Sequence, residues 1–476
     1  MSDTHTACNP LADVHNKRVH LIGAKGTGMC ALAEMLTSSG VKVSGSDTNE
    51  VFYTDKILKE LGIPITSFES TRLSPDTDLA VRSAAYDDNN PTVAAALAAN
   101  IPLISYPQAL GYLSRLYDAA AVAGVHGKTT TTALAGTLVK KLHLPAAVIV
   151  GSAVAGFGDR AVWREGGQFL IAETCEYRRH FLHYHPRRIV LTNVESDHQD
   201  YFPDYGAIKT AFEEFILLLP ENGELIYCRD DAGARDTVES IREKRSDISF
   251  IPYGETANGP WAVEFLPPKP GINEFRVAAY DRVFQLHIPG RHIALNAAAA
   301  LALIHSIWPG VDGAAAAKAL ASFRGSRRRC ETIGEVNGAL VLDDYAHHPT
   351  AIAATLKGIR EFYPQRRIIA DFMPHTYSRT AALLKEFAAC FEHADILILH
   401  PIYASARELD SLGVSGEDLA QRAAAERGKR ITVFHKDFSQ TAEYLRTILC
   451  SDDLFITLGA GNNWNIGREL VGEGSR

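Results

Sequence analysis

One short segment constrains the fold of this chain more than any other. An apolar run, Ala119–Ala123, is typical of a buried strand, and residues 130–142 have the composition of a helix. Between them the chain reads Gly124-Val-His-Gly-Lys-Thr-Thr-Thr-Thr132. A glycine-containing turn from a strand into a helix directs free backbone N–H groups at an anion. The segment therefore predicts a phosphate-binding loop at the edge of an α/β sheet.

The side chains of this loop favour a nucleoside triphosphate. Lys128 supplies a positive charge for the β- and γ-phosphates, and the hydroxyl of Thr129 is a ligand for Mg²⁺. Val122 stands where a complete Walker A motif has its first glycine, so the motif alone is weak, and a bare Gly-Lys-Thr is more often a simple helix N-terminus. Because the flanking strand and helix supply the required context, we expect an ATP site here.

Composition and charge exclude several classes of protein. The 476 residues are 46% apolar and 22% charged, as in ordinary globular proteins of two to four domains. A net charge of −8 gives no electrostatic basis for binding nucleic acid, and no apolar run approaches the ~18 residues of a membrane span. The N-terminus lacks the apolar core of a signal peptide, and the seven cysteines are dispersed. We expect a cytoplasmic protein that binds neither nucleic acid nor membrane.

Short β-rich runs alternate with helical stretches along the whole chain, which is typical of α/β layers with largely parallel sheets. We predict three domains joined by short turns that permit hinge closure. Residues 1–118 form a Rossmann-like domain, and residues 119–323 form a central mixed α/β domain of the P-loop ATPase kind, with an alanine-rich helix at 295–304. Residues 324–476 repeat the strand–helix rhythm as a second Rossmann-like domain.

The first predicted domain has a glycine turn of its own. The stretch Gly23-Ala-Lys-Gly-Thr-Gly28 lies between the strand Arg18–Ile22 and the helix Met29–Leu36, and Asp47 follows the next strand. An acid at the end of the second strand is placed to accept a ribose hydroxyl, although the glycine spacing differs from G-x-G-x-x-G. Taken alone, the turn is weak evidence for NAD. With two nucleotide sites in one chain, we expect one to hold ATP and the other to hold the diphosphate of a substrate.

Polar residues follow two further strands of the central domain. Glu173 ends one strand, and Asp197-His198 follow the next one. Ligands bind parallel α/β sheets at the carboxyl ends of the strands, so Glu173 and His198 are expected to converge on the phosphate loop as cation ligands. Each of them alone is more often a solvated carboxylate or a turn histidine.

Three groups of residues in the last domain have side chains that could bind ligands or take part in catalysis. Arg329 lies in the basic turn that begins this domain and can act as an arginine finger, whereas Arg327 and Arg328 are expected to be solvated. The segment Asp343-Asp344-Tyr-Ala-His-His348 closes a strand, but its residues are too close in sequence for all of them to bind one zinc ion. His375 and Arg379 follow the next strand and offer a cation to a carboxylate.

The motifs GxxGTGM, GVHGKTTTT, EYRRHF, TNVESDH, PGRHxxLN, DDYAHHP, PHTYSRT and GAGN occur in this order from Val19 to about Gly467. This set resembles the Mur ligase family. DDYAHHP and PHTYSRT are specific to one branch, whereas the phosphate loop marks only the superfamily. The resemblance implies an ATP- and Mg²⁺-dependent enzyme of peptidoglycan synthesis. Such an enzyme joins L-alanine to the lactyl carboxylate of UDP-N-acetylmuramate through an acyl phosphate.

The resemblance also implies roles for individual residues. The UDP part of the substrate would contact Gly23, Gly26, Thr27, Gly28, Asp47 and Ser83. ATP would contact Gly124, His126, Gly127, Lys128, Thr129, Thr130, Asn296, Arg329 and Asp344. Mg²⁺ would be held by Thr129, Glu173 and His198, and the amino acid by His348, His375 and Arg379. The residues expected in catalysis are Lys128, His198, Arg329, His348 and Arg379.

Four positions depart from the common pattern of the family. Lys25 stands in place of glycine, Val125 of threonine, Ile293 of asparagine and Thr376 of arginine. Three alternatives stay open: a sister ligase that attaches a tripeptide, an NAD-dependent oxidoreductase, and a non-catalytic nucleotide-binding regulator. For the oligomeric state we expect a monomer or a weak homodimer.

Overall fold

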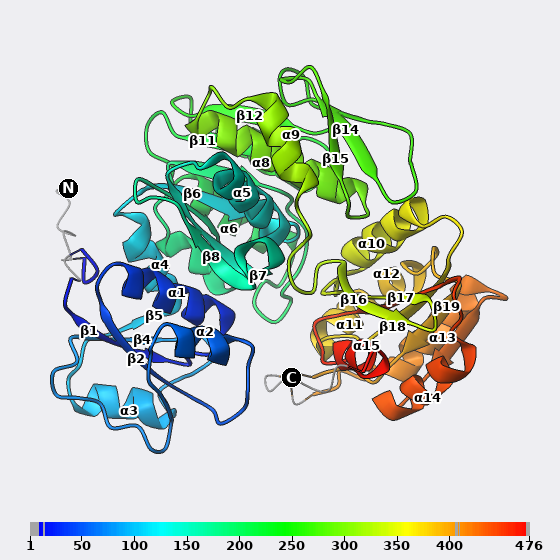
Figure 1. Cartoon of the computed structure of the whole chain (residues 1–476), viewed down its shortest axis with the longest axis horizontal. Coiled ribbons are helices and arrows are strands. Elements are labelled where there is room, and N and C mark those ends of the chain that lie inside the picture. The colour runs from blue at the N-terminus through cyan, green and yellow to red at the C-terminus, as the bar shows by residue number, and fades with distance from the viewer. Residues whose placement is uncertain (1–8, 13–14, 405–407, 409, 473–476) are drawn as a thin grey trace.

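The computed structural model describes residues 9–12, 15–404, 408 and 410–472 (Figure 1). Most of the polar amino-terminal segment, on which the expectation about a signal peptide rests, lies outside these residues. Within the described residues the chain forms four sheets, and parallel strands dominate the three largest. The α/β fold class predicted from the alternating pattern is therefore confirmed.

The amino-terminal unit is a five-stranded parallel sheet with the order β3-β2-β1-β4-β5. Its apolar strand β1 is paired on both sides, which places the glycine turn after β1 in the middle of the carboxyl edge. The elements are β1 (Arg18–Ile22), α1 (Thr27–Ser38), β2 (Lys42–Asp47), α2 (Thr54–Glu60), β3 (Ile65–Ser67), β4 (Leu79–Arg82), α3 (Pro91–Ala98), β5 (Leu103–Ser105) and α4 (Tyr106–Ser114).

The central unit has a seven-stranded sheet with the order β12-β11-β10-β6-β9-β7-β8, in which β8 alone runs antiparallel to its neighbour. Strand β6 lies between β10 and β9, so the loops that follow these three strands meet at one edge. The elements of the sheet and its covering helices are β6 (Asp118–Ala123), α5 (Lys128–Leu142), β7 (Ala146–Val154), η1 (Ala155–Phe157), β8 (Arg160–Arg164), β9 (Phe169–Glu173), η2 (Tyr177–His183), β10 (Arg188–Leu191), α6 (Tyr205–Ile216), β11 (Glu224–Cys228), α7 (Ala232–Arg242) and β12 (Ser249–Tyr253).

A small antiparallel sheet and two helices complete the central unit. Strands β13, β14 and β15 form the antiparallel sheet, and the alanine-rich helix α8 packs against α5. Residues 297–300 of α8 are all buried alanines, whose small side chains let the two helices approach closely. The elements are β13 (Val263–Phe265), β14 (Asn273–Val277), β15 (Val283–Leu286), α8 (Arg291–Ile307) and α9 (Gly313–Ala321).

The carboxy-terminal unit is a six-stranded sheet with the order β16-β17-β21-β18-β19-β20. Only β16, at the edge, is antiparallel to its neighbour, and the sequence pattern did not predict it. The elements are β16 (Glu331–Val336), β17 (Ala339–Asp344), α10 (Pro349–Phe362), β18 (Arg367–Phe372), α11 (Tyr377–Ala382), α12 (Leu384–Ala389), β19 (Ile396–Leu399), α13 (Gly416–Arg427), β20 (Ile431–Phe434), α14 (Phe438–Ile448), β21 (Asp453–Leu458) and α15 (Trp464–Leu470).

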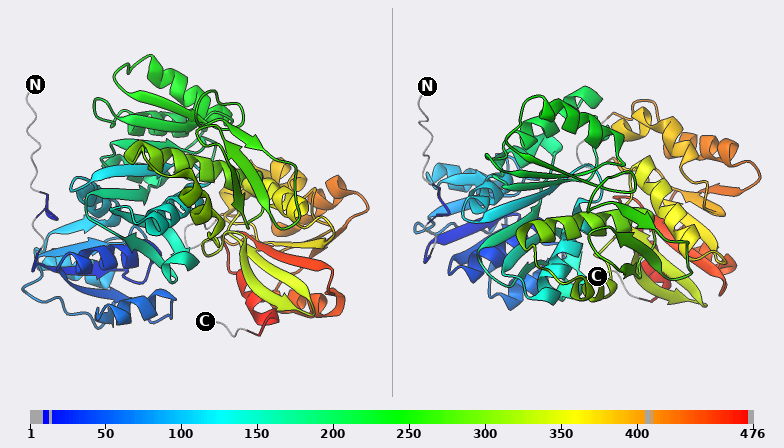
Figure 2. Two further views of the ribbon diagram at one scale, coloured as in Figure 1. Left: turned by 45° about the horizontal axis from the view of Figure 1, so that its top comes forward. Right: turned by 90° about the horizontal axis from the view of Figure 1, so that it is seen from above.

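The central unit contacts both other units, but in different ways (Figures 1 and 2). One apolar cluster runs from the first sheet into the central sheet, and Arg160 of β8 pairs with Glu34 of α1 and, at 2.8 Å, with Glu60 of α2. The carboxy-terminal unit has apolar clusters of its own and meets the central unit largely through polar side chains. The first two units therefore share a core, and the third is docked against them.

No helix in the described part of the chain has both the length and the apolar character needed to cross a bilayer.

Candidate active site

The phosphate loop lies between β6 and α5, as predicted. Gly124 and Gly127 have φ values of +134° and +80°, where side-chain-bearing residues are strained. A Cβ at Gly127 would lie 2.7 Å from Oδ1 of Asn296, so this helix-α8 residue touches the loop. In the described structure no side chain caps the N-terminus of α5, where Thr129 and Thr130 lie buried. The N–H groups of this first turn are therefore available to an anion.

The loop after β10 fixes the phosphate loop from the side. Asn193 accepts a hydrogen bond from the backbone N–H of His126 at 2.9 Å and donates one to its carbonyl at 3.1 Å. Thr192 also donates to the His126 carbonyl. These bonds hold the backbone of His126 in one position.

Lys128 belongs to a buried chain of charges. Its Nζ lies 2.8 Å from Oε2 of Glu176, whose Oε1 is 3.3 Å from Nε2 of His198. Burial alone would lower the pKa of Lys128 and raise that of Glu176, but their pairing reverses both effects. Both groups are therefore charged, and the ammonium is already held near the phosphate loop before any phosphate binds.

Two of the three residues expected to hold Mg²⁺ fit that role directly. Glu173 ends β9, and within the described structure its buried Oε2 has no hydrogen-bond partner. Thr129 is buried at the start of α5, and its hydroxyl oxygen accepts a long hydrogen bond, at 3.4 Å, from Arg329. An unpartnered buried carboxylate oxygen is costly unless a cation or water reaches it. His198 was expected directly after a strand, but it lies seven residues beyond the end of β10 and contacts Glu176.

The turn that begins the third unit reaches the phosphate loop. The guanidinium of Arg329 is 3.4 Å from Oγ1 of Thr129, so it lies beside the phosphate loop. Asp344 accepts from the backbone N–H groups of Cys330 and Ala346, both at 2.7 Å, so it fixes this turn. Burial raises the pKa of Asp344, and Arg329 opposes that rise.

The expectation that Arg327 and Arg328 are solvated is wrong. Arg328 pairs with Asp343 at 3.0 Å and donates to the carbonyl of Gly459 at 2.8 Å. The guanidinium of Arg327 lies 4.8 Å from the centre of the Tyr53 ring, in the first unit. Both cations stabilise the turn because each has a partner from a different segment of the chain.

The groups expected at the amino-acid end lie together, but they are already engaged. Arg379 pairs with Asp197 of the central unit at 2.8 Å, and both side chains are buried. The remaining guanidinium nitrogen of Arg379, Nη1, lies 3.3 Å from Nδ1 of His375. His348 caps α10, and its Nδ1 is 3.6 Å from Oε2 of Glu195. Burial, with the nearby charge of His126, lowers the pKa of His348 to about 4.

The first glycine turn is also built as a binding surface. Gly23 has φ +83°, and a Cβ there would lie 2.9 Å from the Cβ of Ser83. A Cβ at Gly26 would meet only one carbonyl, at 3.6 Å, so the space beside this residue is open. Asp47 accepts from the backbone N–H of Lys25 at 2.7 Å, and thereby shapes the turn.

Tyr106 lies between the two glycine-rich sites. A Cβ at Gly28 would come within 2.9 Å of its ring, and burial together with the negative charge of Glu173 raises its pKa. Thr27, next to Gly28, accepts a hydrogen bond from the hydroxyl of Tyr53 at 2.9 Å. The turn of the first unit therefore approaches the Glu173 side of the central site.

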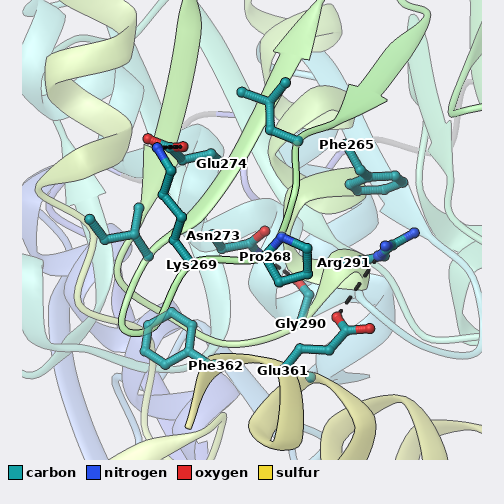
Figure 3. A pocket seen from close by; sticks show the side chains of 12 residues that line it. Phe265, Pro268, Lys269, Asn273, Glu274, Gly290, Arg291, Glu361 and Phe362 are labelled. Atoms are coloured by element: carbon teal, nitrogen blue, oxygen red, sulfur yellow. Dashed lines mark hydrogen bonds and ion pairs between the residues drawn. The ribbon is translucent and has the colours of Figure 1, made fainter. Parts of the chain in front are cut away.

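A separate small pocket lies between the antiparallel sheet and α10 (Figure 3). The charged residues drawn there are paired with one another: Lys269 with Glu274 at 2.7 Å, and Arg291 with Glu361 at 3.8 Å. The pocket lies at the N-terminal end of α8, and we assign it to packing between the central and third units.

Family models match the chain in three consecutive segments. The Mur ligase family catalytic domain matches residues 18–118, the Mur ligase middle domain residues 122–304, and the glutamate ligase domain of Mur ligases residues 328–461. The chain belongs to the Mur ligase family.

Relatives of similar length support this family membership. The UDP-N-acetylmuramate–L-alanine ligase of Treponema pallidum is 48% identical over 467 residues, which are 96% of this chain and 97% of the relative. The ligase of the same name from Desulfitobacterium hafniense is 39% identical, over 95% of this chain and 99% of its own. Among solved structures, UDP-N-acetylmuramate–alanine ligase from Thermotoga maritima has a TM-score of 0.77 at 24% identity, covering 96% of this chain and 98% of that one. At 24% identity, this likeness shows that the two proteins share a fold.

The structure accounts for three of the four departures from the Mur ligase pattern. Lys25 turns its Nζ to the carbonyls of Thr48 and Glu50, at 3.0 and 2.7 Å, and pairs with Asp55 at 3.2 Å, so its charge serves the loop after β2. Ile293 is buried in the apolar cluster of α8. Val125 is buried as well, and nothing in the structure explains Thr376, whose φ is +69°.

Three residues of this Mur ligase site were not singled out from the sequence. Glu176 and Glu195 stand inside the motifs EYRRHF and TNVESDH, and Asp197 was noted only beside His198. Glu176 pairs with Lys128, and Asp197 pairs with Arg379. Glu173 and Glu176 are both visible in the sequence, but two acids three residues apart do not reveal which of them faces Lys128.

Proposed function

We propose that the protein joins L-alanine to the lactyl carboxylate of UDP-N-acetylmuramate, with ATP as the energy source, in peptidoglycan synthesis. The observation that carries this proposal is the 48% identity to the Treponema pallidum ligase of that name over 96% of the chain. The phosphate loop and the glycine turn of the first unit support it, because this reaction needs two nucleotides at once. Folylpolyglutamate synthase of Mycobacterium tuberculosis, a structural neighbour with a TM-score of 0.58, has been solved with ADP.

We assign residues 1–118 to the UDP-substrate, 119–323 to ATP, and 324–476 to closure and amino-acid binding. Mg²⁺ would be held by Thr129, Glu173 and His198, and it would neutralise the charge that develops on the phosphates. The buried, unpartnered oxygen of Glu173 supports this assignment. A cytoplasmic location and a monomer or weak homodimer complete the proposal, with no role for nucleic acid or membrane.

The chemistry proceeds in two balanced steps. An oxygen of the lactyl carboxylate attacks the γ-phosphorus, a P–O bond forms, and ADP leaves as its bond to that phosphorus breaks. The neutral amine of L-alanine then attacks the acyl carbon, the C–N bond forms, the C–O bond to the phosphate breaks, and inorganic phosphate leaves with the proton that the nitrogen loses. Phosphoryl transfer depends mainly on positioning and charge stabilisation, which Lys128 and Arg329 would supply.

Docking of the third unit has a chemical purpose in this scheme. An acyl phosphate hydrolyses in water, so the site must exclude water while the intermediate exists. Arg329 and His348, both from the third unit, lie against Thr129 and Glu195 of the central unit. These contacts would close the site over the intermediate.

The test is phosphate release by the purified protein with ATP, Mg²⁺ and each nucleotide sugar in turn. We expect release to require both UDP-N-acetylmuramate and L-alanine. Release that depends on L-alanyl-γ-D-glutamyl-meso-diaminopimelate instead would assign the protein to the tripeptide-adding ligases. Release without an amino acid would contradict both functions. Comparing L-alanine, glycine and L-serine at equal concentration would then define the amino-acid preference.

A further inference from the structure

A compact group of metal-binding side chains lies where the central and third units meet. His126 comes from the phosphate loop, Glu195 from the loop after β10, and His348 from the start of α10. One ligand atom of each residue lies within 4.8 Å of the others. None of the three belongs to the set Thr129, Glu173 and His198 that we assign to Mg²⁺.

The three side chains are close together without being hydrogen-bonded to one another. Nε2 of His126 is 3.7 Å from Oε2 of Glu195, and Nδ1 of His348 is 3.6 Å from the same oxygen. Both separations exceed the length of a hydrogen bond. In the described structure Nε2 of His126 and Nε2 of His348 are buried and have no hydrogen-bond partner. Nδ1 of His348 accepts a long hydrogen bond, at 3.4 Å, from the backbone N–H of Thr350, so the ring nitrogens that no protein group engages beside the carboxylate are the two Nε2 atoms.

These separations suit a small tetrahedral ion. With bonds of ~2.0–2.1 Å to nitrogen and oxygen, the ligand atoms of a tetrahedral zinc site are ~3.4 Å apart. The two separations measured from Oε2 of Glu195 exceed this value by a few tenths of an ångström, and all three ligand atoms lie within 4.8 Å of one another, so side-chain rotations would bring them around one ion. Two imidazoles and one carboxylate are a ligand set that zinc uses in proteins when it keeps a fourth position open.

The surroundings hold the ligands in place and balance the charge. Oε2 of Glu195 accepts a hydrogen bond from the hydroxyl of Thr350 at 2.9 Å, and the backbone of His126 is fixed by Asn193. Second-shell bonds of this kind orient metal ligands. Arg379, whose charge reaches His348, is paired with Asp197 at 2.8 Å, so the carboxylate of Glu195 can offset the charge of an incoming cation.

We propose that His126, Glu195 and His348 form a binding site for a divalent transition-metal ion, preferentially Zn²⁺, that bridges the central and third units. The imidazole nitrogens select Zn²⁺ over Mg²⁺, which prefers oxygen ligands. A bound ion would tie the start of α10 to the phosphate loop. The site is separate from the catalytic Mg²⁺ set, and it does not depend on the proposed ligase reaction.

The test is a titration of the metal-free, full-length protein with Co²⁺, a spectroscopic substitute for Zn²⁺, in excess Mg²⁺ and without nucleotide. We expect one equivalent of Co²⁺ to bind with visible absorption bands typical of tetrahedral coordination, and Zn²⁺ to abolish those bands. Removing a direct ligand should cost at least as much as losing a second-shell partner, so Glu195→Gln and His348→Gln should each weaken binding by at least ~10-fold.

Two control variants, each altered at a residue outside the proposed ligand set, show whether binding depends on that set. His347→Gln removes the neighbouring histidine, whose Nδ1 bonds the carbonyl of Tyr345 instead, and Glu173→Gln removes a residue of the Mg²⁺ set. Both should retain Co²⁺ binding. Unchanged affinity in Glu195→Gln and His348→Gln, or loss of the bands in Glu173→Gln alone, would overturn the proposal. If a variant fails to fold, X-ray absorption of the zinc-loaded native protein decides, because fewer than two imidazoles around the ion would contradict the site.

Discussion

Arg379 and Asp197 form an ion pair across the boundary between the third and central units, with 2.8 Å between the guanidinium and the carboxylate. Both side chains are almost fully buried. Burial alone would raise the pKa of Asp197, but Arg379 and the nearby histidines His198 and His347 hold it well below its ordinary value. The pair is therefore charged, and it links α11 to the loop that carries His198.

Because Arg379 is paired with Asp197, we expect Arg379→Ala to affect the stability of the protein as well as its activity. Breaking a buried ion pair leaves one charge without a partner and typically costs ~3–5 kcal/mol. We expect Arg379→Ala to lower the melting temperature, and Asp197→Asn in the same chain to restore part of the loss. A fall that Asp197→Asn does not relieve would show that the two residues are not energetically linked.

The same variant tests the role of Arg379 in binding the amino acid. If the guanidinium holds the carboxylate of L-alanine once the substrate enters, losing a charge-assisted bond of ~1.5–3 kcal/mol should raise the alanine KM by ~10- to 150-fold. Lysine should restore only part of the binding, because it lacks the planar fork. Steady-state kinetics at saturating ATP and UDP-substrate measure kcat and the KM for L-alanine. An unchanged alanine KM with a lower kcat would refute this role.

A second prediction concerns Lys128 and its partner Glu176. Lys128→Ala should reduce kcat by ~10²- to 10³-fold, because one preorganised charge at the transferring phosphate is lost. The variant also leaves Glu176 buried without its 2.8 Å partner, so its melting temperature should fall. Adding Glu176→Gln should restore the melting temperature and leave the rate low. Activity within a few-fold of wild type in Lys128→Ala would contradict the role of the phosphate loop.

Much of the fold could be predicted from the sequence because its signals are local. The predicted strand Arg18–Ile22 agrees with β1, and the predicted strand Ala119–Ala123 lies within β6. Buried parallel strands produce continuous apolar runs that a reader can find without knowing their neighbours. Strand β16 (Glu331–Val336) lies half-exposed at a sheet edge and carries two glutamates, so its pattern resembles a loop.

The site was less predictable because its contacts join distant segments. The loop Gly124–Thr132 and the end of β9 at Glu173 were located correctly, since each follows from one strand–turn pattern. The pairing of Lys128 with Glu176 spans 48 positions, and that of Arg379 with Asp197 spans 182. Such pairs depend on strand order and on how the third unit docks, which no single motif encodes.

A third prediction separates binding from folding at the first glycine turn. Space beside Gly26 is open, and its φ of −59° suits any residue, so Gly26→Val should fold normally. The side chain should instead obstruct the pyrophosphate and raise the KM for the UDP-substrate while leaving that for ATP nearly unchanged. Gly28→Ala is the matched contrast, because its Cβ would meet Tyr106 at 2.9 Å and should lower the melting temperature. An equal rise in both KM values for Gly26→Val would argue against two separate nucleotide sites.

The fourth prediction addresses Mg²⁺. Glu173→Gln should raise the Mg²⁺ concentration for half-maximal activity by at least ~10-fold, because a ligand carboxylate is lost. Its Oε2 is buried without a hydrogen-bond partner in the described structure, so the variant should be at least as stable as the native protein without metal. Mg²⁺ titrations and thermal melts measure the two effects. An unaltered Mg²⁺ requirement would remove Glu173 from the metal set.

The last prediction concerns a buried pair outside the active site. His400 and Asp371 are fully buried, with 2.7 Å between Nε2 and the carboxylate. Burial alone would lower the pKa of His400, but Asp371 and the carbonyl of His435 raise it above the ordinary value of 6.5. A histidine whose pKa is raised by folding stabilises the protein fully below the unfolded value, and this stability is lost as the pH rises through the folded value.

The stability contributed by His400 should therefore be complete at pH 6 and decline as the pH rises above 6.5. Asp371→Asn removes the charge that raises the pKa, and it should cost ~3–5 kcal/mol at pH 6, as expected for a broken buried pair. The cost should shrink at pH 9, where His400 is closer to neutral in both proteins. Urea unfolding of both proteins at the two pH values measures the free-energy cost of the substitution at each pH. The contributions of other titrating groups are the same in both proteins and cancel in this cost. A cost that is equal at pH 6 and pH 9 would mean that His400 is not charged in the folded protein.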